Sequence, residues 1–224
     1  TMNNALIINL KAYKQATGNA TSHLLDLFET VTVPDQTRLI IAVNPVDTRL
    51  AAATSLPVYA QHGDADGYGS HTGHVIAESL EELGCDGVLL NHSERQLSEE
   101  AVKETVQRVQ AATELNTVVC AQSVDEAANM ARFKPDVIGI EPPELIGGQT
   151  SVSTAKPELI EDGVEATKDY NVPLYCGAGV KTTEDVRHAV ELGAEGVLVA
   201  SGVVKADNPA RAAQNLLDGF SSER

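Results

Sequence analysis

The sequence predicts an α/β protein whose eight parallel strands close into a (β/α)8 barrel. Eight short apolar runs rich in β-branched residues recur along the chain, and a segment with helical spacing follows each run. No linker interrupts this series, so the 224 residues divide into units of about 28 residues. We therefore expect a single barrel domain over residues 1–224. A doubly wound open sheet is the alternative, because periodicity does not report whether a sheet closes.

The expected strands are continuously apolar rather than alternating, as is typical of parallel strands that helices cover on both faces. Taken in order, they are ALIIN (5–9), LIIAV (39–43), LPVYA (56–60), GVLLN (87–91), NTVVCA (116–121), DVIGIE (136–141), VPLYC (172–176) and GVLVA (196–200). In either architecture, functional side chains are expected just after the carboxyl ends of these strands.

The expected helices repeat apolar residues every three or four positions and carry charge on the remaining face. The clearest examples cover residues 74–83, 99–112, 124–133, 157–170 and 184–193. Each lies between two expected strands, which is the order that a (β/α)8 chain requires.

The charge balance excludes some classes of partner. The chain has 16 basic and 32 acidic side chains, a formal net charge of -16. Because nucleic acids and anionic membranes are bound by clustered Lys and Arg, we expect neither as a partner. No apolar run is long enough for a transmembrane helix, and the polar start lacks a signal-peptide pattern, so we expect a cytoplasmic protein.

The acidic residues are spread along the chain rather than gathered in a tail, which is typical of solvated helix faces. Their excess accompanies no Trp and only three Phe. This composition also fits a halophilic protein from a salt-rich cytoplasm, and both interpretations stay open. The three cysteines, Cys85, Cys120 and Cys176, lack the spacing of a structural zinc site or a disulfide framework.

The ends of the first, fourth and sixth expected strands carry polar and acid–base groups, and the ends of the last two carry small residues. Asn9 and Lys11 follow the first strand, His92 follows the fourth, and Glu141 ends the sixth. CGAG (176–179) and ASG (200–202) end the last two, where backbone N–H groups could hold an anion. A carboxylate, an imidazole and an ammonium around one cavity suit proton abstraction beside a carbonyl and stabilisation of an enediolate. Such chemistry needs no metal or cofactor.

Four segments at these positions resemble the triosephosphate isomerase family in its shorter archaeal form. They are NLK (9–11), GSHTGHV (69–75), NHSER (91–95) and EPPELIGGQT (141–150), and they follow one another in the family's order. The resemblance covers essentially the whole chain. It implies the fold known as the TIM barrel and cofactor-free interconversion of dihydroxyacetone phosphate and D-glyceraldehyde 3-phosphate, in glycolysis and gluconeogenesis.

The resemblance also implies residue roles. Glu141 would be the catalytic base, and a neutral His92 would polarise the carbonyl oxygens. Lys11 would provide a positive charge, Asn9 would bind the substrate, and the acid Glu94 would support Lys11 and His92 from behind. Ile146 and Gly147 would close over the phosphate as part of a lid.

The phosphate site departs from the commoner form of the family at three positions. Gly179 replaces a serine, so it offers no hydroxyl, and Ala200 and Ser201 replace a pair of glycines. All three residues remain expected substrate contacts through their backbone N–H groups, although a Cβ at Ala200 limits how closely the backbone approaches an oxygen.

The loop over residues 61–73 permits two interpretations. The resemblance implies that it docks into a second copy of the chain, with Thr72 at the contact, in a homodimer or homotetramer. A metal site is the alternative, since the loop region contains several potential ligands; however, the HTGH segment supplies only two, and we expect no metal. The potential ligands are His62, Asp64, Asp66, His71 and His74.

Two other functions fit a phosphate-binding barrel less well. A metal-dependent pentose-phosphate epimerase would need several His and Asp ligands at the strand ends, which this sequence lacks there. A catalytically silent metabolite-binding barrel would be expected to lack the Glu or the His, whereas Glu141 and His92 are both present.

Overall fold

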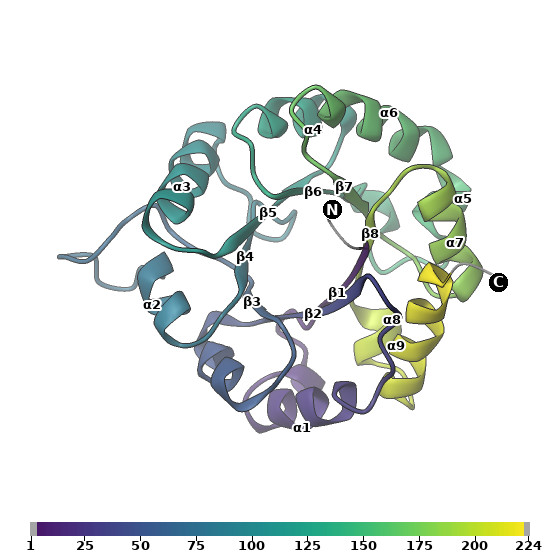
Figure 1. Cartoon of the computed structure of the whole chain (residues 1–224), viewed down its shortest axis with the longest axis horizontal. Coiled ribbons are helices and arrows are strands. Elements are labelled where there is room, and N and C mark those ends of the chain that lie inside the picture. The colour runs from purple at the N-terminus through teal and green to yellow at the C-terminus, as the bar shows by residue number, and fades with distance from the viewer. Residues whose placement is uncertain (1–3, 222–224) are drawn as a thin grey trace.

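Eight parallel strands form a ring that helices surround on the outside (Figure 1). The structure is a computed structural model that describes residues 4–221. Each strand pairs with the next in chain order, and β1 also pairs with β8, from Ala5 opposite Gly196 to Ile8 opposite Val199. The predicted closed barrel is thereby confirmed over the open sheet. The strands are β1 (Asn4–Asn9), β2 (Thr37–Val43), β3 (Val58–Ala60), β4 (Gly87–Leu90), β5 (Asn116–Ala121), β6 (Val137–Ile140), β7 (Leu174–Cys176) and β8 (Gly196–Val199).

Two strands, β3 and β7, begin two residues later than the apolar runs that predicted them. β3 begins directly after Pro57 and β7 directly after Pro173. Proline lacks a backbone N–H, so it cannot donate to the sheet at those positions. Its carbonyl still accepts, because Ile41 N–H donates to Pro57 O and Ile138 N–H donates to Pro173 O, both at 3.0 Å.

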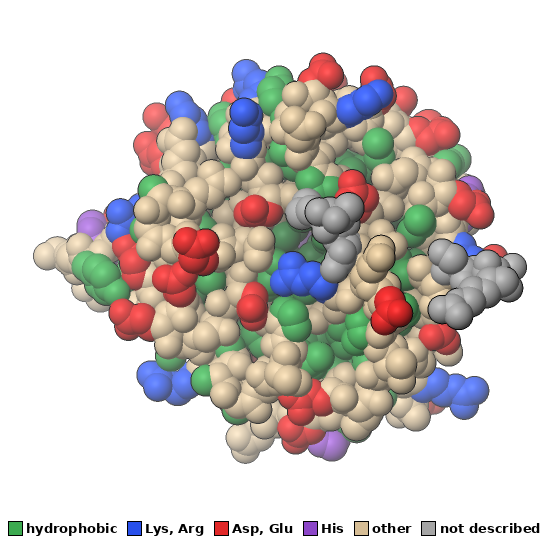
Figure 2. Space-filling model, in the orientation of Figure 1, with side chains coloured by type: hydrophobic (Ala, Val, Ile, Leu, Met, Phe, Trp, Pro, Cys, Tyr) green, Lys and Arg blue, Asp and Glu red, His purple; other side chains and the backbone are tan. Residues whose placement is uncertain are grey.

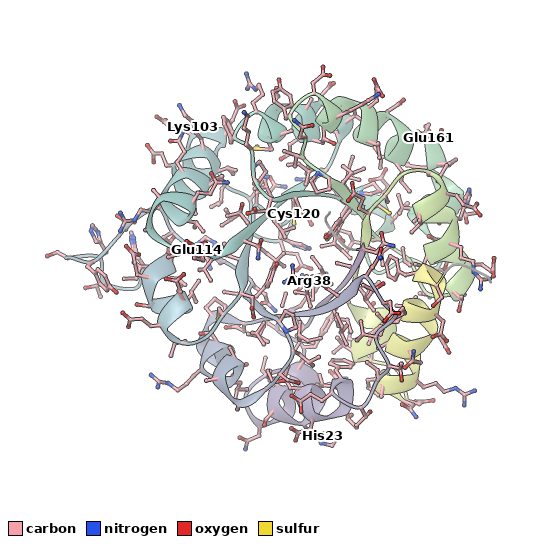
Figure 3. The ribbon with its side chains drawn as sticks, in the orientation of Figure 1. His23, Arg38, Lys103, Glu114, Cys120 and Glu161 are labelled. Atoms are coloured by element: carbon pink, nitrogen blue, oxygen red, sulfur yellow. The ribbon has the colours of Figure 1, made fainter. Side chains whose placement is uncertain are left out.

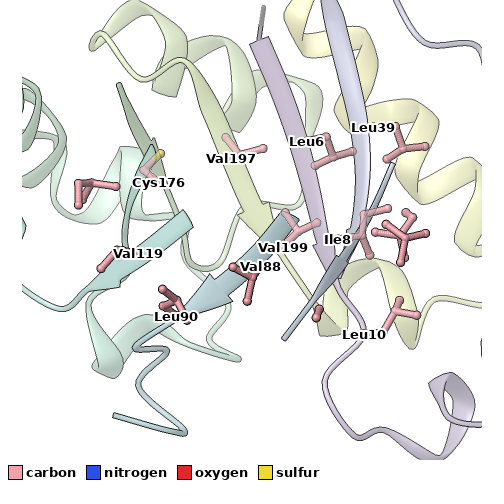
Figure 4. Packing of buried hydrophobic residues seen from close by; sticks show 14 of the residues in the cluster. Leu6, Ile8, Leu10, Leu39, Val88, Leu90, Val119, Cys176, Val197 and Val199 are labelled. Atoms are coloured by element: carbon pink, nitrogen blue, oxygen red, sulfur yellow. The ribbon is translucent and has the colours of Figure 1, made fainter. Parts of the chain in front are cut away.

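The apolar core has two layers, because alternate residues of each strand point to opposite faces. Leu6 and Ile8 belong to the layer between the strands and the helices (Figure 4). Ala5 and Ile7 belong to a smaller cluster built from strand residues, which fills the barrel interior. Glycine makes room there: a Cβ on Gly139 would lie 2.9 Å from a methyl group of Leu198.

The helices lie outside the ring, and most begin at a side-chain cap. Ser98, Ser123 and Thr182 cap α3, α4 and α7, and Thr182 forms a reciprocal capping box with Asp185. The helices are α1 (Asn19–Phe28), α2 (Ala77–Glu82), α3 (Glu99–Ala112), α4 (Val124–Ala131), α5 (Val152–Ala155), α6 (Pro157–Lys168), α7 (Thr183–Glu191), α8 (Ser201–Val204) and α9 (Pro209–Leu217). Four 3-10 segments are η1 (Lys14–Ala16), η2 (Pro45–Ala53), η3 (Pro143–Leu145) and η4 (Asp218–Phe220).

Helix α2 begins three residues later than the expected start at residue 74. Side chains of the preceding loop hold this stretch: Asp66 bonds to the His74 imidazole at 2.5 Å, and Asp64 accepts from Val75 N–H at 2.7 Å. Ile76 is extended and provides no side-chain cap. The prediction of helix over 74–76 was therefore wrong, because local hydrogen bonds compete with helix formation there.

The charged residues lie mainly on the outside of the molecule. Acidic side chains are scattered over the face in Figure 2, with basic ones between them. His23, Lys103 and Glu161 lie on the outer helices, whereas Arg38 lies toward the centre of the ring (Figure 3). Within residues 4–221, no helix has the length and apolarity needed to cross a membrane.

Candidate active site

The carboxyl ends of the strands bring the predicted site residues into one pocket. Asn9, Lys11, His92 and Glu141 line it, although they lie at or just after the ends of three different strands, β1, β4 and β6. The residues expected to contact the phosphate, Ile146, Gly147, Gly179, Ala200 and Ser201, line the same pocket. Glu94 lines a neighbouring hollow together with Lys11 and His92.

A carboxylate and an imidazole face each other in this pocket. Nε2 of His92 lies 3.5 Å from Oε1 of Glu141, and the two side chains are only 9% and 12% exposed. The backbone N–H of Glu94 donates to Nδ1 of His92 at 3.1 Å. Since a backbone N–H can only donate, Nδ1 is an acceptor, and a neutral His92 carries its proton on Nε2. That proton points toward the carboxylate side of the pocket.

Asn91 fixes the segment that carries His92. It follows β4 with a φ of 60°, a left-handed conformation that asparagine tolerates well. Its Nδ2 donates to the carbonyl of Cys120 at 3.0 Å and to Glu126 at 2.9 Å, while its Oδ1 accepts from Leu97 N–H at 2.8 Å. The sequence analysis gave no role to Asn91 or Glu126; the available signal was the position of Asn91 at the end of the expected strand over 87–91.

Lys11 is held by its backbone as well as by its charge. Its Nζ lies 2.7 Å from Oε1 of Glu94, 83 positions away in the sequence. Its φ is 51°, and the turn is stabilised by Asn9 Oδ1, which accepts from Lys11 N–H, and by Gln61 Nε2, which donates to Lys11 O; both bonds are 3.0 Å. Gln61 was also missed, although it directly follows β3 and satisfies the strand-end rule.

Residues 142–150 form a loop that begins directly beside Glu141 and contains the short turn η3. Glu144 pairs with Lys156 at the start of α6, and the hydrogen bond from Lys156 lowers the pKa of this carboxyl. At its other end, Gln149 Oε1 accepts a 2.9 Å hydrogen bond from Lys181 Nζ. The loop thus borders the pocket and is held at both ends by lysines of other segments.

The pocket offers backbone donors at the loop and after β7. In the part of the chain that the structure describes, the N–H groups of Gly147 and Gly179 donate to no protein acceptor. Gly179 has a φ of 75°, and a Cβ there would lie 2.1 Å from the carbonyl oxygen of Thr150. Glycine is therefore required at this contact, and its free N–H group suits an anion.

The comparisons with known proteins agree with this geometry. The family model described as triosephosphate isomerase matches residues 4–216. The chain belongs to the triosephosphate isomerase family. The triosephosphate isomerase of Archaeoglobus fulgidus is 45% identical over 95% of this chain and 96% of its own length. Those of Cenarchaeum symbiosum and Methanocaldococcus jannaschii are 43% and 40% identical, over 96% and 95% of this chain and 97% and 98% of their own lengths.

Two cysteine thiols lie near Glu141 in this isomerase-family chain, and neither has the chemistry of a nucleophile. Cys120 and Cys176 are buried. Burial, and secondarily the nearby Glu141 carboxylate, raises the pKa of Cys176 to about 12 and that of Cys120 well above its usual value. Both groups stay protonated near neutral pH, so neither is an activated nucleophile.

The loop over residues 61–73 and the adjoining His74 bring together three of the five potential metal ligands. The ligand atoms of Asp66, His71 and His74 lie within 4.8 Å of one another. Asp66 joins the two imidazoles, with oxygens 3.1 Å from His71 Nδ1 and 2.5 Å from His74 Nδ1. The separate pair of His62 Nε2 and Asp64 Oδ1, at 2.8 Å, closes the base of the loop. Hydrogen bonds among these side chains account for the clustering.

Proposed function

We propose that the protein interconverts dihydroxyacetone phosphate and D-glyceraldehyde 3-phosphate through an enediolate, with no metal or cofactor. The observation that carries this proposal is the 3.5 Å approach of His92 Nε2 to Glu141 Oε1 inside the pocket. A proton acceptor and a proton donor therefore lie side by side in one pocket, where both can reach the same small hydroxycarbonyl substrate. Membership of the triosephosphate isomerase family supports the same substrate.

In this mechanism, the Glu141 carboxylate removes a proton from the carbon next to the carbonyl. The electron pair of the broken C–H bond forms the carbon–carbon double bond of the enediolate, and negative charge moves to the carbonyl oxygen. The Nε2–H of His92 donates to that oxygen, and the Lys11 ammonium stabilises the charge. The proton of the neighbouring hydroxyl passes by way of His92 Nε2 to the former carbonyl oxygen, and Glu141 returns the carbon-bound proton to the former carbonyl carbon, which completes the exchange of aldehyde and ketone.

The phosphate is assigned to the opposite side of the pocket. The N–H groups of Gly147 and Gly179 are free to donate, and Ala200 and Ser201 line the same end. When the lid over 142–150 closes, Ile146 and Gly147 cover this group and exclude water. Closure also keeps the enediolate from eliminating its phosphate, because it holds the C–O bond away from the alignment that elimination needs.

We assign the loop over residues 61–73 to contact with a second copy, in a homodimer or homotetramer. The loop projects from the ring beside α2 (Figure 1), and Tyr68 in it is 67% exposed. Thr72, near its tip, is exposed too. The hollow lined by Lys11, Glu94 and Arg95 is open beside the active site and could receive such a tip. We place this enzyme and its reaction in the cytoplasm.

A coupled isomerase assay tests the proposed function. The purified protein, treated with a metal chelator, should convert dihydroxyacetone phosphate to glyceraldehyde 3-phosphate at an undiminished rate. A rate that falls with the chelator would favour a metal-dependent enzyme. Turnover of a pentose phosphate in a second assay would then identify it as an epimerase. Binding of the triose phosphate without turnover would favour a silent binding protein.

A further inference from the structure

Two lysines line the candidate pocket, and their surroundings differ. Lys11 is 10% exposed, and its ammonium is paired with the Glu94 carboxylate at 2.7 Å. Lys181 is exposed at the mouth of the pocket, on the segment between β7 and α7. Its ammonium donates to the uncharged amide of Gln149 at 2.9 Å. That contact does not neutralise the charge of Lys181.

Lys181 lies next to both segments that are assigned to the phosphate, the one after β7 and the one after β8. It follows Gly179 by two residues, and its Cγ lies 3.5 Å from the position of a Cβ on Gly202, the neighbour of Ser201. Its backbone N–H donates to Asp185 Oδ2 at 2.9 Å. This oxygen also accepts from the Thr182 N–H at 3.0 Å, so the Asp185 carboxylate is engaged by the cap of α7, and the neighbouring Glu184 carboxylate pairs with Arg187. The backbone is thus fixed, while the side chain ends at the pocket.

A phosphate dianion needs positive charge in this protein. The chain carries a net charge of -16, and Glu141 and Glu94 both lie at or beside the pocket. Lys11 is already compensated by Glu94. Gly179 and Gly147 supply N–H groups but no charge, and neither has a side-chain donor. A second, uncompensated ammonium at the phosphate end would offset the repulsion that the dianion meets.

We propose that Lys181 is a phosphate-binding residue, whose ammonium leaves Gln149 and contacts the phosphate of the substrate when the lid closes. The inference rests on the proposed function, since it takes the phosphate end of the pocket as given. The exchange is inexpensive, because a hydrogen bond between exposed groups contributes little once water competes for both partners. Gln149 belongs to the lid, so the same movement that covers the phosphate also releases Lys181.

The test measures two constants, the inhibition constant of inorganic phosphate and the KM of the substrate, in wild type and in four variants. Lys181→Met should raise both the inhibition constant of phosphate and KM by about tenfold, the effect of one charge-assisted hydrogen bond, with kcat within about threefold of wild type. Lys181→Arg should recover most of the affinity, because the charge is retained. Lys168→Met, which removes the same charge from the exposed end of α6, should match wild type.

Gln149→Ala separates phosphate binding from simple anchoring of the lid. If Lys181 binds phosphate, this variant keeps the phosphate affinity within about threefold of wild type, and the salt dependence of inhibition is weakened only in Lys181→Met. If Gln149→Ala loses as much affinity as Lys181→Met, Lys181 acts through the lid alone and the proposal is overturned. The proposal is also overturned if the wild-type protein is an active isomerase and phosphate inhibits it and Lys181→Met with the same inhibition constant. A wild-type protein without isomerase activity would instead overturn the proposed function.

Discussion

Two residues at the carboxyl ends of the strands adopt a left-handed backbone conformation. Lys11 and Asn91, with φ values of 51° and 60°, both lie where the chain leaves the barrel. For a lysine this conformation costs on the order of 1–2 kcal/mol. The hydrogen bonds from Asn9 and Gln61 offset that cost at Lys11. Local strain of this kind directs the Lys11 side chain into the pocket.

The substitution Glu141→Gln should leave the fold intact and remove the base. An amide has nearly the same shape as the carboxylate but cannot accept the proton, so kcat should fall at least about 100-fold while KM changes far less. The coupled isomerase assay gives both constants. Glu161→Gln is the matched control, since Glu161 lies on the outer helix α6 (Figure 3), and it should retain wild-type activity. A Glu141→Gln enzyme with more than a tenth of the wild-type kcat would contradict the assignment.

The three cysteines should resist alkylation in the native protein. Burial, with a smaller effect of Asp86, raises the pKa of Cys85 to about 11, and burial also raises the pKa of Cys176 to about 12 and that of Cys120 well above its usual value. A raised thiol pKa lowers the fraction of the reactive thiolate at a given pH. Labelling at pH 8.5 should therefore be at least about 100-fold slower than in the denatured chain. Mass spectrometry after timed treatment with iodoacetamide measures this. Rapid native labelling at Cys120 would show that its environment is not closed to solvent.

The lid combines a stiff beginning with a flexible centre. Pro142 and Pro143 fix the chain next to Glu141, whereas Gly147, with a φ of 71°, and Gly148 follow the turn η3. The Glu144–Lys156 pair and the Gln149–Lys181 hydrogen bond hold its two halves to the barrel. These exposed contacts are weak enough to break during closure.

Deleting Ile146 to Gly148 should change what the enzyme produces. Without the centre of the lid, the enediolate is exposed to water and can eliminate phosphate, so methylglyoxal formation should rise relative to isomerisation. Quantifying both products from the same reaction mixture provides the ratio independently of the amount of active enzyme. A ratio equal to that of wild type would count against the lid.

The projecting loop over 61–73 is the segment that we assign to contact with a second copy of the chain. Thr72→Arg adds a large charged side chain at its tip, and we expect monomers with little activity, because the loop of a partner would support Lys11 and His92. Size measured in solution by light scattering, together with the isomerase assay, tests this. Ser22→Arg adds the same side chain to the exposed face of α1 and should leave assembly and activity unchanged. A fully active Thr72→Arg monomer would refute the role of the loop.

At the scale of the whole molecule, stability should rise with salt. The net charge of -16 is distributed as scattered surface acids (Figure 2), which repel one another in the compact state. Raising the ionic strength from 0.1 M to 1 M shortens the Debye length from about 10 Å to about 3 Å and screens this repulsion. The core contains many Ala and Val residues, so less apolar area is available to oppose the repulsion at low salt.

We expect a Tm several degrees higher in 2 M than in 0.1 M KCl. Salt also screens the lysines from the phosphate, so KM should increase under the conditions that stabilise the fold. Thermal melts and assays at the two concentrations measure both effects. An equal or lower Tm in 2 M KCl would mean that the acidic residues are ordinary solvated surface rather than an adaptation to salt.

The sequence by itself determined most of the elements and the main chemical groups. Continuous apolar runs predicted all eight strands, because a strand covered on both faces must be apolar at successive positions. The strand-end rule then selected Lys11, His92 and Glu141, since parallel strands expose their carboxyl ends on one side.

Only the tertiary structure decided closure, long-range contacts and one helix start. Pairing of β1 with β8 closes the ring, and no local pattern encodes a hydrogen bond between the first and last strands. The Lys11–Glu94 and Lys181–Gln149 contacts join distant segments, so they depend on the packed barrel. Asp64 and Asp66 delay α2 for the same reason: side-chain hydrogen bonds of a folded loop outweigh the helical pattern at residues 74–76.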